Sequence, residues 1–328
     1  MRKFLTLLLA AVMCLCAFTA CSDTSSDATA TPDGDGEDVV IDEVVVDEES
    51  PQADESAAAD AAESADAATA DASGSTDYTA MAADAAAAGD DSLQRVIDNG
   101  YFIVGLDDSF PPMGYVDEDG NLTGFDVDLA TAVAEQMGLE AKLQAIDWKA
   151  KELELDGGNI DVIWNGYTIT PERQAAVLMS EPYLENTQVI VVPADSDIKT
   201  LADLAGKKVA VQDGSSAQEA IADNAELASS IGQQVDFKDN VTALMDVSSG
   251  QTDALAVDSV VAEYYLAKEP GKYVILSETL APEQYGIGFR KDEQAFLDAV
   301  EAALKELKEN GKAAEVSIKW FGDDVTTF

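Results

Sequence analysis

The stretch "IDVIWNGYTITPERQ", residues 160–174, decides the fold, because it joins a buried strand to a helix through a run of hydrogen-bonding groups. "IDVIW" is a short apolar run typical of a buried strand. Thr170 is a suitable N-cap and the proline after it fits the first helical position. Arg173 then lies in the first helical turn, where partial positive charge disfavours a cation. This placement indicates either a surface ion pair with Glu172 or Glu181, or a functional role for Arg173.

The same change from strand to helix recurs through residues 92–328. "YFIVGLD" is typical of a short buried strand, and "GFDVDLATAVAEQMG" is typical of a helix that ends at its last glycine. Further short apolar runs follow, and helical stretches separate most of them. This alternation predicts an α/β fold with mainly parallel sheets covered on both faces, in which ligands bind at the carboxyl ends of strands.

Two more polar clusters follow apolar runs. In "VQDGSSAQE", Ser216 and Glu219 are spaced as a capping box that opens a helix, and a helix N-terminus behind "GSS" can bind an anion. In "DALAVDSVV", Asp258 follows the apolar run directly. Each has a purely structural alternative, because Ser216 and Asp258 could serve only as helix caps.

Composition excludes several classes of function. The chain has no histidine, and its three cysteines lie near the N-terminus at positions 14, 16 and 21. Residues 92–328, which we call the body, therefore cannot contain nucleophile systems of the Ser-His-Asp or Cys-His types, nor the usual zinc sites. The net charge of −45, without a basic stripe, argues against nucleic acid as a partner. Only metals with oxygen ligands are left, and no phosphate loop is present. No cofactor and no metal site are expected.

The first 21 residues have the pattern of a secretory signal. A basic start precedes an apolar run, and "FTAC" resembles the lipobox of bacterial lipoproteins, although Phe18 stands where that motif usually has leucine. The resemblance makes Cys21 the lipidated residue. The alternative is an uncleaved membrane anchor, near the short limit of about 17 residues for spanning. Either interpretation places the body on the outer face of the bacterial cytoplasmic membrane, extracellular or periplasmic.

Residues 22–91 are rich in Ala, Asp, Glu, Ser and Thr and contain no lysine or arginine. Such a low-complexity acidic segment buries too little apolar surface to fold, so we expect a disordered tether. Its length allows a span of roughly 45 Å, extended further by self-repulsion. A plain spacer is the simpler interpretation, and an acidic tail that recruits a partner is the alternative.

Taken together, these motifs resemble the bacterial extracellular solute-binding proteins, family 3, which serve ABC importers of polar amino acids. The resemblance rests on the order and spacing of "VGLDDSFPPMGYVDEDGNLTGFDVDLA", "GNIDVIWNGYTITPERQ", "SEPY", "DLAGKKVAVQDGSSA" and "SGQTDALAVD". It implies a two-lobed periplasmic-binding-protein-like fold with two hinge strands and a ligand cleft between the lobes. The hinge crossings are expected near Val192 to Ala194 and near Gly286 to Phe289. The expected domains are a lipoprotein signal peptide (1–21), a tether (22–91), lobe 1 (92–192 and 288–328) and lobe 2 (193–287).

The resemblance also implies the ligand site. Arg173 matches the arginine that binds the ligand carboxylate, and Asp258 matches the acid that binds the α-ammonium. Phe110 matches an aromatic residue that packs on the ligand. Asp107 lies where, in some relatives, an acid reaches the side chain of a basic amino acid. The alternative is that Asp107 serves only to cap a turn. The other residues implied at the ligand are Trp164, Asn165, Gly166, Thr168, Ser215 and Ser216.

The function implied is a substrate-binding lipoprotein that closes on a polar amino acid and delivers it to the permease subunits of an ABC transporter. No lysine or arginine lies in "GLDDSFPPMGY", so a neutral or cationic ligand is favoured over an acidic one. No enzymatic activity is expected. Two alternatives stay open: an amino-acid-sensing domain for a receptor, and a dehydratase on the same fold that uses carboxylates alone.

Overall fold

The structure, a computed structural model, describes residues 75–328. The predicted signal peptide, Cys21 and most of the predicted tether lie outside these residues. Within the described part of the chain, no helix is both long enough and apolar enough to cross a membrane. The helices are α1 (Tyr78–Ala88), α2 (Ser92–Asn99), α3 (Phe125–Gln136), α4 (Lys151–Asp156), α5 (Pro171–Ala176), α6 (Ser216–Asp223), α7 (Ala225–Ser230), α8 (Asn240–Ser248), α9 (Ser259–Lys268), α10 (Gln294–Glu309) and α11 (Lys312–Phe321). The strands are β1 (Tyr101–Leu106), β2 (Ser109–Phe110), β3 (Gly114–Val116), β4 (Leu122–Thr123), β5 (Glu140–Ala145), β6 (Val162–Thr168), β7 (Leu178–Met179), β8 (Leu184–Pro193), β9 (Lys208–Gln212), β10 (Gln233–Phe237), β11 (Ala254–Asp258), β12 (Tyr273–Ile275) and β13 (Ala281–Phe289).

One continuous sheet runs through the folded body in the order β10-β9-β11-β8-β13-β6-β1-β5, with β12 beside β8 and β7 beside β13. The pairs β1–β5, β1–β6, β9–β10 and β9–β11 are parallel, as the alternation of strands and helices predicts. A small sheet of β2, β3 and β4 stands apart. The α/β fold class is therefore confirmed.

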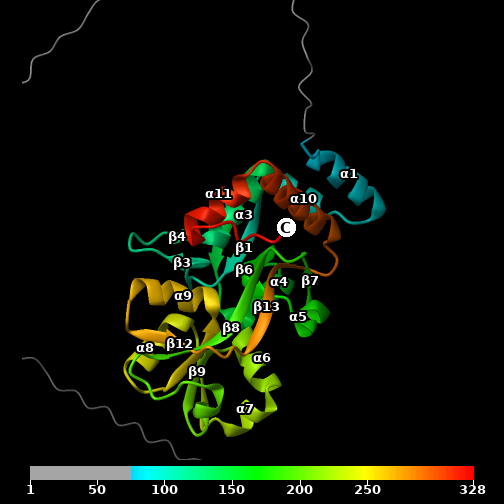
Figure 1. Cartoon of the computed structure of the whole chain (residues 1–328). Helices are drawn as coiled ribbons and strands as arrows, with labels where there is room; N and C mark the ends of the chain where they lie inside the picture. The colour runs from blue at the N-terminus through cyan, green and yellow to red at the C-terminus, as the bar shows by residue number, and fades with distance from the viewer. Residues whose placement is uncertain (1–74) are drawn as a thin grey trace, which may run out of the picture. The chain divides into compact units, whose positions relative to one another are not determined.

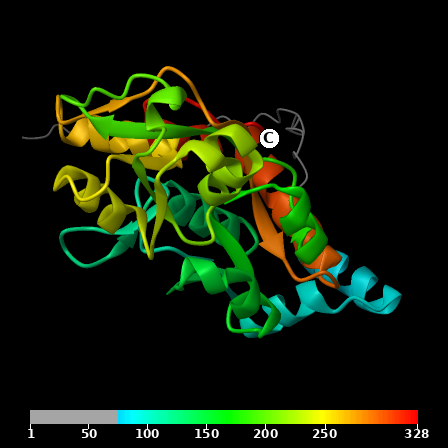
Figure 2. The same ribbon diagram turned by 90° about the horizontal axis from the view of Figure 1, so that it is seen from below.

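The long strands β8 and β13 connect the two halves of the sheet (Figure 1). β8 pairs with β11 on one edge, and on its other edge it pairs first with β13 and further along with β12. β13 in turn pairs with β6 from Tyr285 onward. Lobe 1 thus contains β1, β5, β6 and β7, and lobe 2 contains β9 to β12. Figure 2 shows the same ribbon from below.

The two crossings lie earlier along the chain than the sequence predicts. β8 and β13 pair with each other over residues 184–188 and 281–285, and the apolar end of β8 is already part of the sheet of lobe 2. Residues 192–194 and 286–289 were expected to cross, but they lie within lobe 2 and lobe 1 respectively. A continuous apolar run indicates that a strand is buried on both faces. It does not indicate at which residue the strand passes from one lobe to the other, so the sequence misplaced the crossings.

Each lobe has helices on both faces of its sheet. In lobe 1, α3 and α10 pack with each other and with α11, while α4 and α5 lie near β6 and β7 on the other face. That second face is filled by Trp148, Leu155, Ile160, Ile163, Tyr167 and Val177. In lobe 2, α6 packs on β8, β9 and β11, and α8 and α9 also pack on this sheet. Double coverage explains why the strands have continuous apolar sequences.

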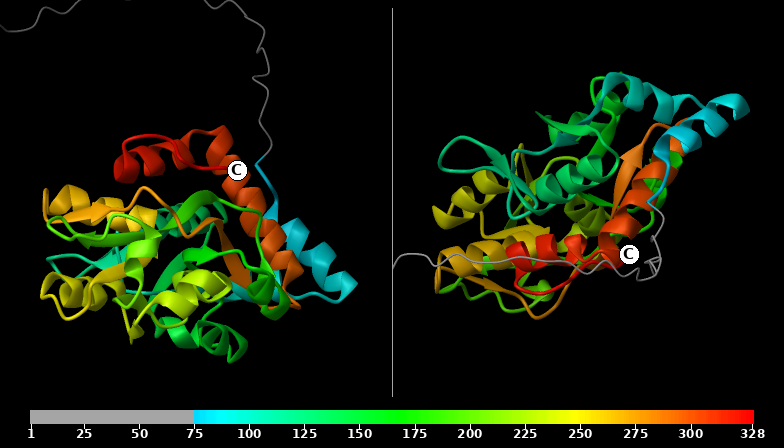
Figure 3. Two further views of the ribbon diagram at one scale, coloured as in Figure 1. Left: turned by 60° about the horizontal axis from the view of Figure 1, so that its bottom comes forward. Right: turned by 90° about the horizontal axis from the view of Figure 1, so that it is seen from above.

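The tether prediction is wrong at its C-terminal end, because residues 78–88 form helix α1. This helix lies along α10 and contacts α2 (Figure 3). Tyr78 and Ala82 are buried, and Glu306 of α10 accepts hydrogen bonds from the Thr76 N–H (2.6 Å) and the Tyr78 hydroxyl (3.4 Å). An alanine-rich composition does not show that two of its residues meet a complementary surface, so the sequence alone suggested a tether.

Candidate functional site

The polar groups that follow β1, β6, β9 and β11 meet where the two lobes face each other. Asp107, Thr168, Ser216 and Asp258 belong to these four strand ends, and each is almost fully buried. Carboxyl ends of parallel strands share one edge of a sheet, so each lobe contributes its own polar edge to the same cleft. The structure therefore brings together the clusters that the sequence singled out.

Arg173 is buried rather than paired on the surface. α5 begins at Pro171 after the N-cap Thr170, as predicted, and Arg173 is 4% exposed. Its guanidinium donates to Thr168 O (3.1 Å) and, across the cleft, to Gly214 O (3.3 Å). It stacks 4.7 Å from the Tyr167 ring centroid. The expected surface pairs with Glu172 or Glu181 are not formed, and the nearest acid is Glu219 of lobe 2, at 3.5 Å.

The helix cap of lobe 2 differs from the prediction by one residue. Ser215, not Ser216, is the N-cap of α6, and its hydroxyl accepts a hydrogen bond from Gln218 N (3.3 Å). Ser216 is the first helical residue, so its hydroxyl is available to the cleft. It lies 3.0 Å from the Thr168 hydroxyl of lobe 1. The two hydroxyls form a direct contact between lobes beside Arg173.

Asp258 is at the N-cap position of α9, yet its side chain makes no capping hydrogen bond. Its Oδ1 accepts hydrogen bonds from Asn186 Nδ2 (2.8 Å) and from the Tyr285 hydroxyl (2.6 Å) instead. Asn186 lies on one hinge strand and Tyr285 on the other. The interpretation of Asp258 as only a helix cap is therefore wrong, because its carboxylate is directed at the hinge.

Asp107 is buried at the end of β1. Its Oδ1 accepts a hydrogen bond from Ser109 N (2.9 Å), and its Oδ2 accepts one from Gln212 Nε2 of lobe 2 (2.5 Å). Burial raises the pKa of Asp107 to about 6, with smaller contributions from Asp239 and Asp108. The bond from Ser109 shows that Asp107 does cap a turn, which was the alternative role suggested by the sequence. The bond from Gln212 adds a contact across the cleft.

Phe110, Asn165 and Gly166 lie beside Asp107, whereas Trp164 does not join them. Asn165 accepts a hydrogen bond from Asp107 N (3.0 Å). Gly166 has φ +56°, and a Cβ there would lie 2.7 Å from the Phe110 ring, so this contact requires glycine. Trp164 is instead part of the hydrophobic core of lobe 1, with its ring 6.2 Å from that of Tyr183.

The Gly166 N–H is already occupied inside lobe 1. It donates to Asp126 Oδ2 (2.8 Å), which also accepts from the Tyr183 hydroxyl (3.0 Å). Complete burial raises the pKa of Asp126 to about 7. Gly166 therefore shapes the cleft through its backbone conformation and its fixed hydrogen bond to Asp126.

Several residues of the site were missed by sequence reasoning. Gln212 ends β9, and Asn186, Gln188 and Glu283 lie on the hinge strands at alternate positions. Asn186 and Gln188 are spaced by two and so share a face of β8, but their neighbours Glu185 and Thr187 are polar too, so the sequence did not single them out. Lys151 was also missed. It is buried, donates to Gly214 O (3.0 Å), and burial lowers its pKa to about 8, assisted by the charge of Arg173.

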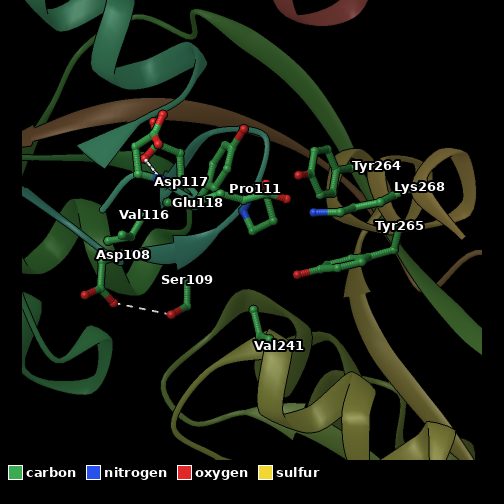
Figure 4. Close-up of a pocket in the computed structure, with 12 residues that line it drawn as sticks. Asp108, Ser109, Pro111, Val116, Asp117, Glu118, Val241, Tyr264, Tyr265 and Lys268 are labelled. Atoms are coloured by element: carbon green, nitrogen blue, oxygen red, sulfur yellow. Dashed lines mark hydrogen bonds between the residues drawn. The ribbon is translucent and has the colours of Figure 1, made fainter. Parts of the chain in front are cut away.

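A cavity of about 660 Å³ lies between the lobes, next to Asp107. Its lobe 1 wall includes Asp108, Ser109 and Pro111, and its lobe 2 wall consists of Val241, Tyr264, Tyr265 and Lys268. In Figure 4 the Lys268 amine and the two tyrosine hydroxyls point across the cavity toward Pro111. The cavity offers space for a ligand side chain that extends beyond Asp107.

The chemistry of the site suits a zwitterion. One end presents the Arg173 guanidinium with the hydroxyls of Thr168 and Ser216, which are donors for a carboxylate. The other end presents the Asp258 carboxylate, an acceptor for an ammonium. In residues 75–328, no group of three His, Cys, Asp or Glu side chains is arranged to hold a metal ion.

Known proteins resemble this chain in sequence and fold. The sequence profile of the bacterial extracellular solute-binding proteins, family 3, matches residues 102–323. The L-cystine-binding protein TcyJ of Escherichia coli (strain K12) is 34% identical over 239 residues, which cover 71% of this chain and 87% of that protein. The arginine-binding extracellular protein ArtP of Bacillus subtilis (strain 168) is 33% identical over 222 residues, 67% of this chain and 85% of that protein.

A solved structure agrees with the two-lobed architecture. The crystal structure of an ABC uptake transporter substrate-binding protein from Streptococcus pneumoniae with bound histidine matches with a TM-score of 0.71 and 37% sequence identity. The match covers 74% of this chain and 100% of that one. The resemblance seen in the sequence is therefore confirmed: the chain belongs to the bacterial extracellular solute-binding proteins, family 3.

Proposed function

We propose that the protein is the substrate-binding component of an ABC importer, which captures a polar amino acid by closing its two lobes and delivers it to the permease subunits. One observation carries the proposal: at one end of the cleft Arg173 bonds to Gly214 and Thr168 to Ser216 of the opposite lobe, and Asp258 lies at the other end. Relatives named for binding cystine, arginine and histidine agree with an amino acid as the ligand class.

The two charged ends of the ligand determine the roles. Arg173 holds the α-carboxylate through its planar pair of N–H donors, aided by Thr168 and Ser216, and Ser215 fixes the start of α6. Asp258 holds the α-ammonium. Asn165 and Gly166 shape the wall beside Phe110, which packs on the ligand. Trp164 supports this wall from the core.

The ligand's side chain is neutral or cationic in this proposal. Asp107 precedes Asp108, which lines the cavity between the lobes. Asp117, Glu118 and Asp119 line it too, and Lys268 is the one cation among the lining residues. A second carboxylate on the ligand side chain would meet net negative charge there. Arginine, lysine and glutamine suit this environment.

Anchoring is a separate part of the proposal. Lipidation of Cys21, which the "FTAC" motif supports, would hold the protein on the outer face of the cytoplasmic membrane. Cys21→Ser should release the protein into the medium or periplasm, or leave it unprocessed, while a lipid label should be incorporated only into the wild type. Incorporation of the label into Cys21→Ser would contradict the assignment.

The direct test is a thermal-shift panel of all common amino acids and cystine at saturating concentration. A ligand at about a hundred times its dissociation constant stabilises by roughly 2.7 kcal/mol, which is easily measured. The largest shift from glutamate or aspartate would contradict the ligand class, and no shift from any compound would contradict the function. Recovery of the ligand unchanged separates binding from dehydration, and transport by reconstituted permease separates delivery from sensing.

A further inference from the structure

Two carboxylates share one amide group at the hinge. Asn186 Nδ2 donates to Asp258 Oδ1 (2.8 Å) and to Glu283 Oε1 (2.6 Å). Asp258 ends β11 of lobe 2, Glu283 is on β13, and Asn186 is on β8. Because both oxygens accept from the same nitrogen, the two carboxyl groups are neighbours. They meet where both hinge strands cross.

Glu283 also links this pair to the opposite end of the cleft. Its Oε1 accepts from Gln188 Nε2 (2.8 Å), and Gln188 donates in turn to the Ser216 hydroxyl (3.2 Å). Ser216 contacts Thr168 beside Arg173. One chain of hydrogen bonds therefore runs from the carboxylate end of the site to Asp258, and Glu283 stands in the middle of it.

No cation compensates the pair within the described residues. Neither Asp258 nor Glu283 belongs to an ion pair closer than 4.0 Å between residues 75 and 328. The groups that face them are neutral amides and hydroxyls from every element packed there: Asn186 and Gln188 of β8, Ser216 of α6, Tyr285 of β13, with Tyr183 nearby. Two neighbouring anions in such surroundings repel each other strongly.

Carboxylates in this situation keep a proton. Like charges at close range disfavour double ionisation, and burial disfavours it further. Burial, followed by the charge of Asp258, raises the pKa of Glu283 to about 8. Because the two groups interact, the proton belongs to the pair rather than to one residue. At neutral pH the pair therefore carries about one negative charge instead of two.

We propose that the Asp258–Glu283 pair holds one proton in the free protein and releases it to solvent when the α-ammonium of the ligand binds. The inference rests on the proposed function, since it needs an amino acid at this end of the cleft. The ammonium supplies the positive charge that the proton supplied before, so both carboxyl groups become ionised around it. No covalent bond changes, and the released proton passes to the buffer.

The exchange makes binding depend on pH. Below the pKa of the pair, each ligand must displace a proton, so affinity should rise by up to about tenfold per pH unit between pH 6 and 8. Above that pKa no proton remains to be displaced, and the dependence should level off. Glu283 thus becomes a residue that tunes the ammonium end without replacing Asp258.

Calorimetry with L-arginine and L-glutamine as probes measures the exchange directly, because neither side chain titrates near pH 7. Binding at pH 7 in phosphate, HEPES and Tris buffers, which differ in ionisation enthalpy, should show release of about one proton per ligand. Glu283→Gln keeps an oxygen acceptor for Asn186 and Gln188 but removes the shared proton. With L-glutamine, which brings no cation to Asp107, it should release far less than one proton and lose most of the rise in affinity between pH 6 and 8.

Two controls separate this effect from general perturbation. Glu185→Gln removes an exposed carboxylate from the neighbouring hinge strand and should behave as wild type. The desamino analogue of arginine, 5-guanidinopentanoate, lacks the ammonium and should bind more weakly without proton release. Binding of either amino acid by the wild type without proton release would overturn the inference alone, as would unchanged release by a folded Glu283→Gln. Absence of binding by every amino acid would overturn the proposed function with it.

Discussion

Gln212 of lobe 2 donates its side-chain amide to Asp107 of lobe 1 over 2.5 Å, so the closed cleft joins the lobes through the residue expected to meet the ligand side chain. Both groups are buried. A buried carboxylate needs a partner, and an amide donor can stabilise its charge without neutralising it. The charge of the Asp107 carboxylate is not neutralised by the Gln212 amide, and a cationic ligand side chain would neutralise it.

Asp107→Asn should therefore discriminate between ligands. If arginine or lysine binds the wild type, the variant should lose thirty-fold or more for that ligand, since removing one partner of a buried charge pair costs about 2–5 kcal/mol. Glutamine should lose only a few-fold. Calorimetry measures both, with the exposed Asp108→Asn as control. Equal losses of affinity for arginine and glutamine would show that Asp107 affects binding only by capping its turn and does not pair with the ligand side chain.

Arg173→Ala and Asp258→Ala should each weaken binding by roughly thirty-fold to several-thousand-fold, because each leaves a charged end of the ligand unpaired. Arg173→Lys should recover only part of the loss, since lysine cannot donate two parallel bonds. Calorimetry gives the affinities and circular dichroism checks the fold. Lys305→Ala, on the exposed face of α10, is the control. Binding by either alanine variant within about three-fold of wild type would remove that residue from the site.

We expect closure of the lobes to depend on Gly214. It has φ +75°, and a Cβ there would lie 3.1 Å from Lys149 Cα of the other lobe. Gly214→Ala should reduce affinity by about tenfold or more and diminish the ligand-induced decrease in radius of gyration measured by X-ray scattering. Gly250 also has φ +75° but nothing within 4 Å, so Gly250→Ala imposes the same backbone strain without the contact. Equal affinities for the two variants would show that this contact does not limit closure.

Helix α1 should contribute to stability but not to binding. Tyr78→Ala should lower the free energy of unfolding by about 2–3 kcal/mol, because the ring is buried against the body. Thr79→Ala, an exposed change on the same helix, is the control. A chain starting at Gly89 should melt at lower temperature and bind its ligand with wild-type affinity. Lost affinity in this shortened chain would connect α1 to the cleft.

Asp126 should make stability depend on pH. Its pKa is about 7 in the folded protein and 3.8 without perturbation, so the folded state binds the proton more tightly. The free energy of unfolding should therefore fall as pH rises from about 4 to 7, by at most about 1.4 kcal/mol per unit. Urea unfolding of Asp126→Asn should lack this part of the slope, and the exposed Asp292→Asn should retain it. Parallel curves for Asp126→Asn and the wild type would contradict the assignment.

The sequence alone determined the local features of the site. Thr170 and the proline after it start α5 as predicted, so Arg173 lies in the first helical turn because capping preferences act within a few residues. The end of β11 likewise places Asp258 before α9. The order of strands and helices also predicted the α/β class, since double coverage of a sheet leaves apolar runs in the sequence.

Only the tertiary structure decided which residues meet. Asn186 and Gln188 of β8 are far along the chain from both Gln212 and Glu283. Their contacts depend on how β8 and β13 pair and on how closely the lobes approach. The packing of α1 on the folded body likewise depends on Glu306 and α10, which lie more than 200 residues away along the chain. Local preferences fix backbone conformation over one or two turns, whereas partners distant in sequence are chosen by the packing free energy of the whole fold, which no short stretch contains.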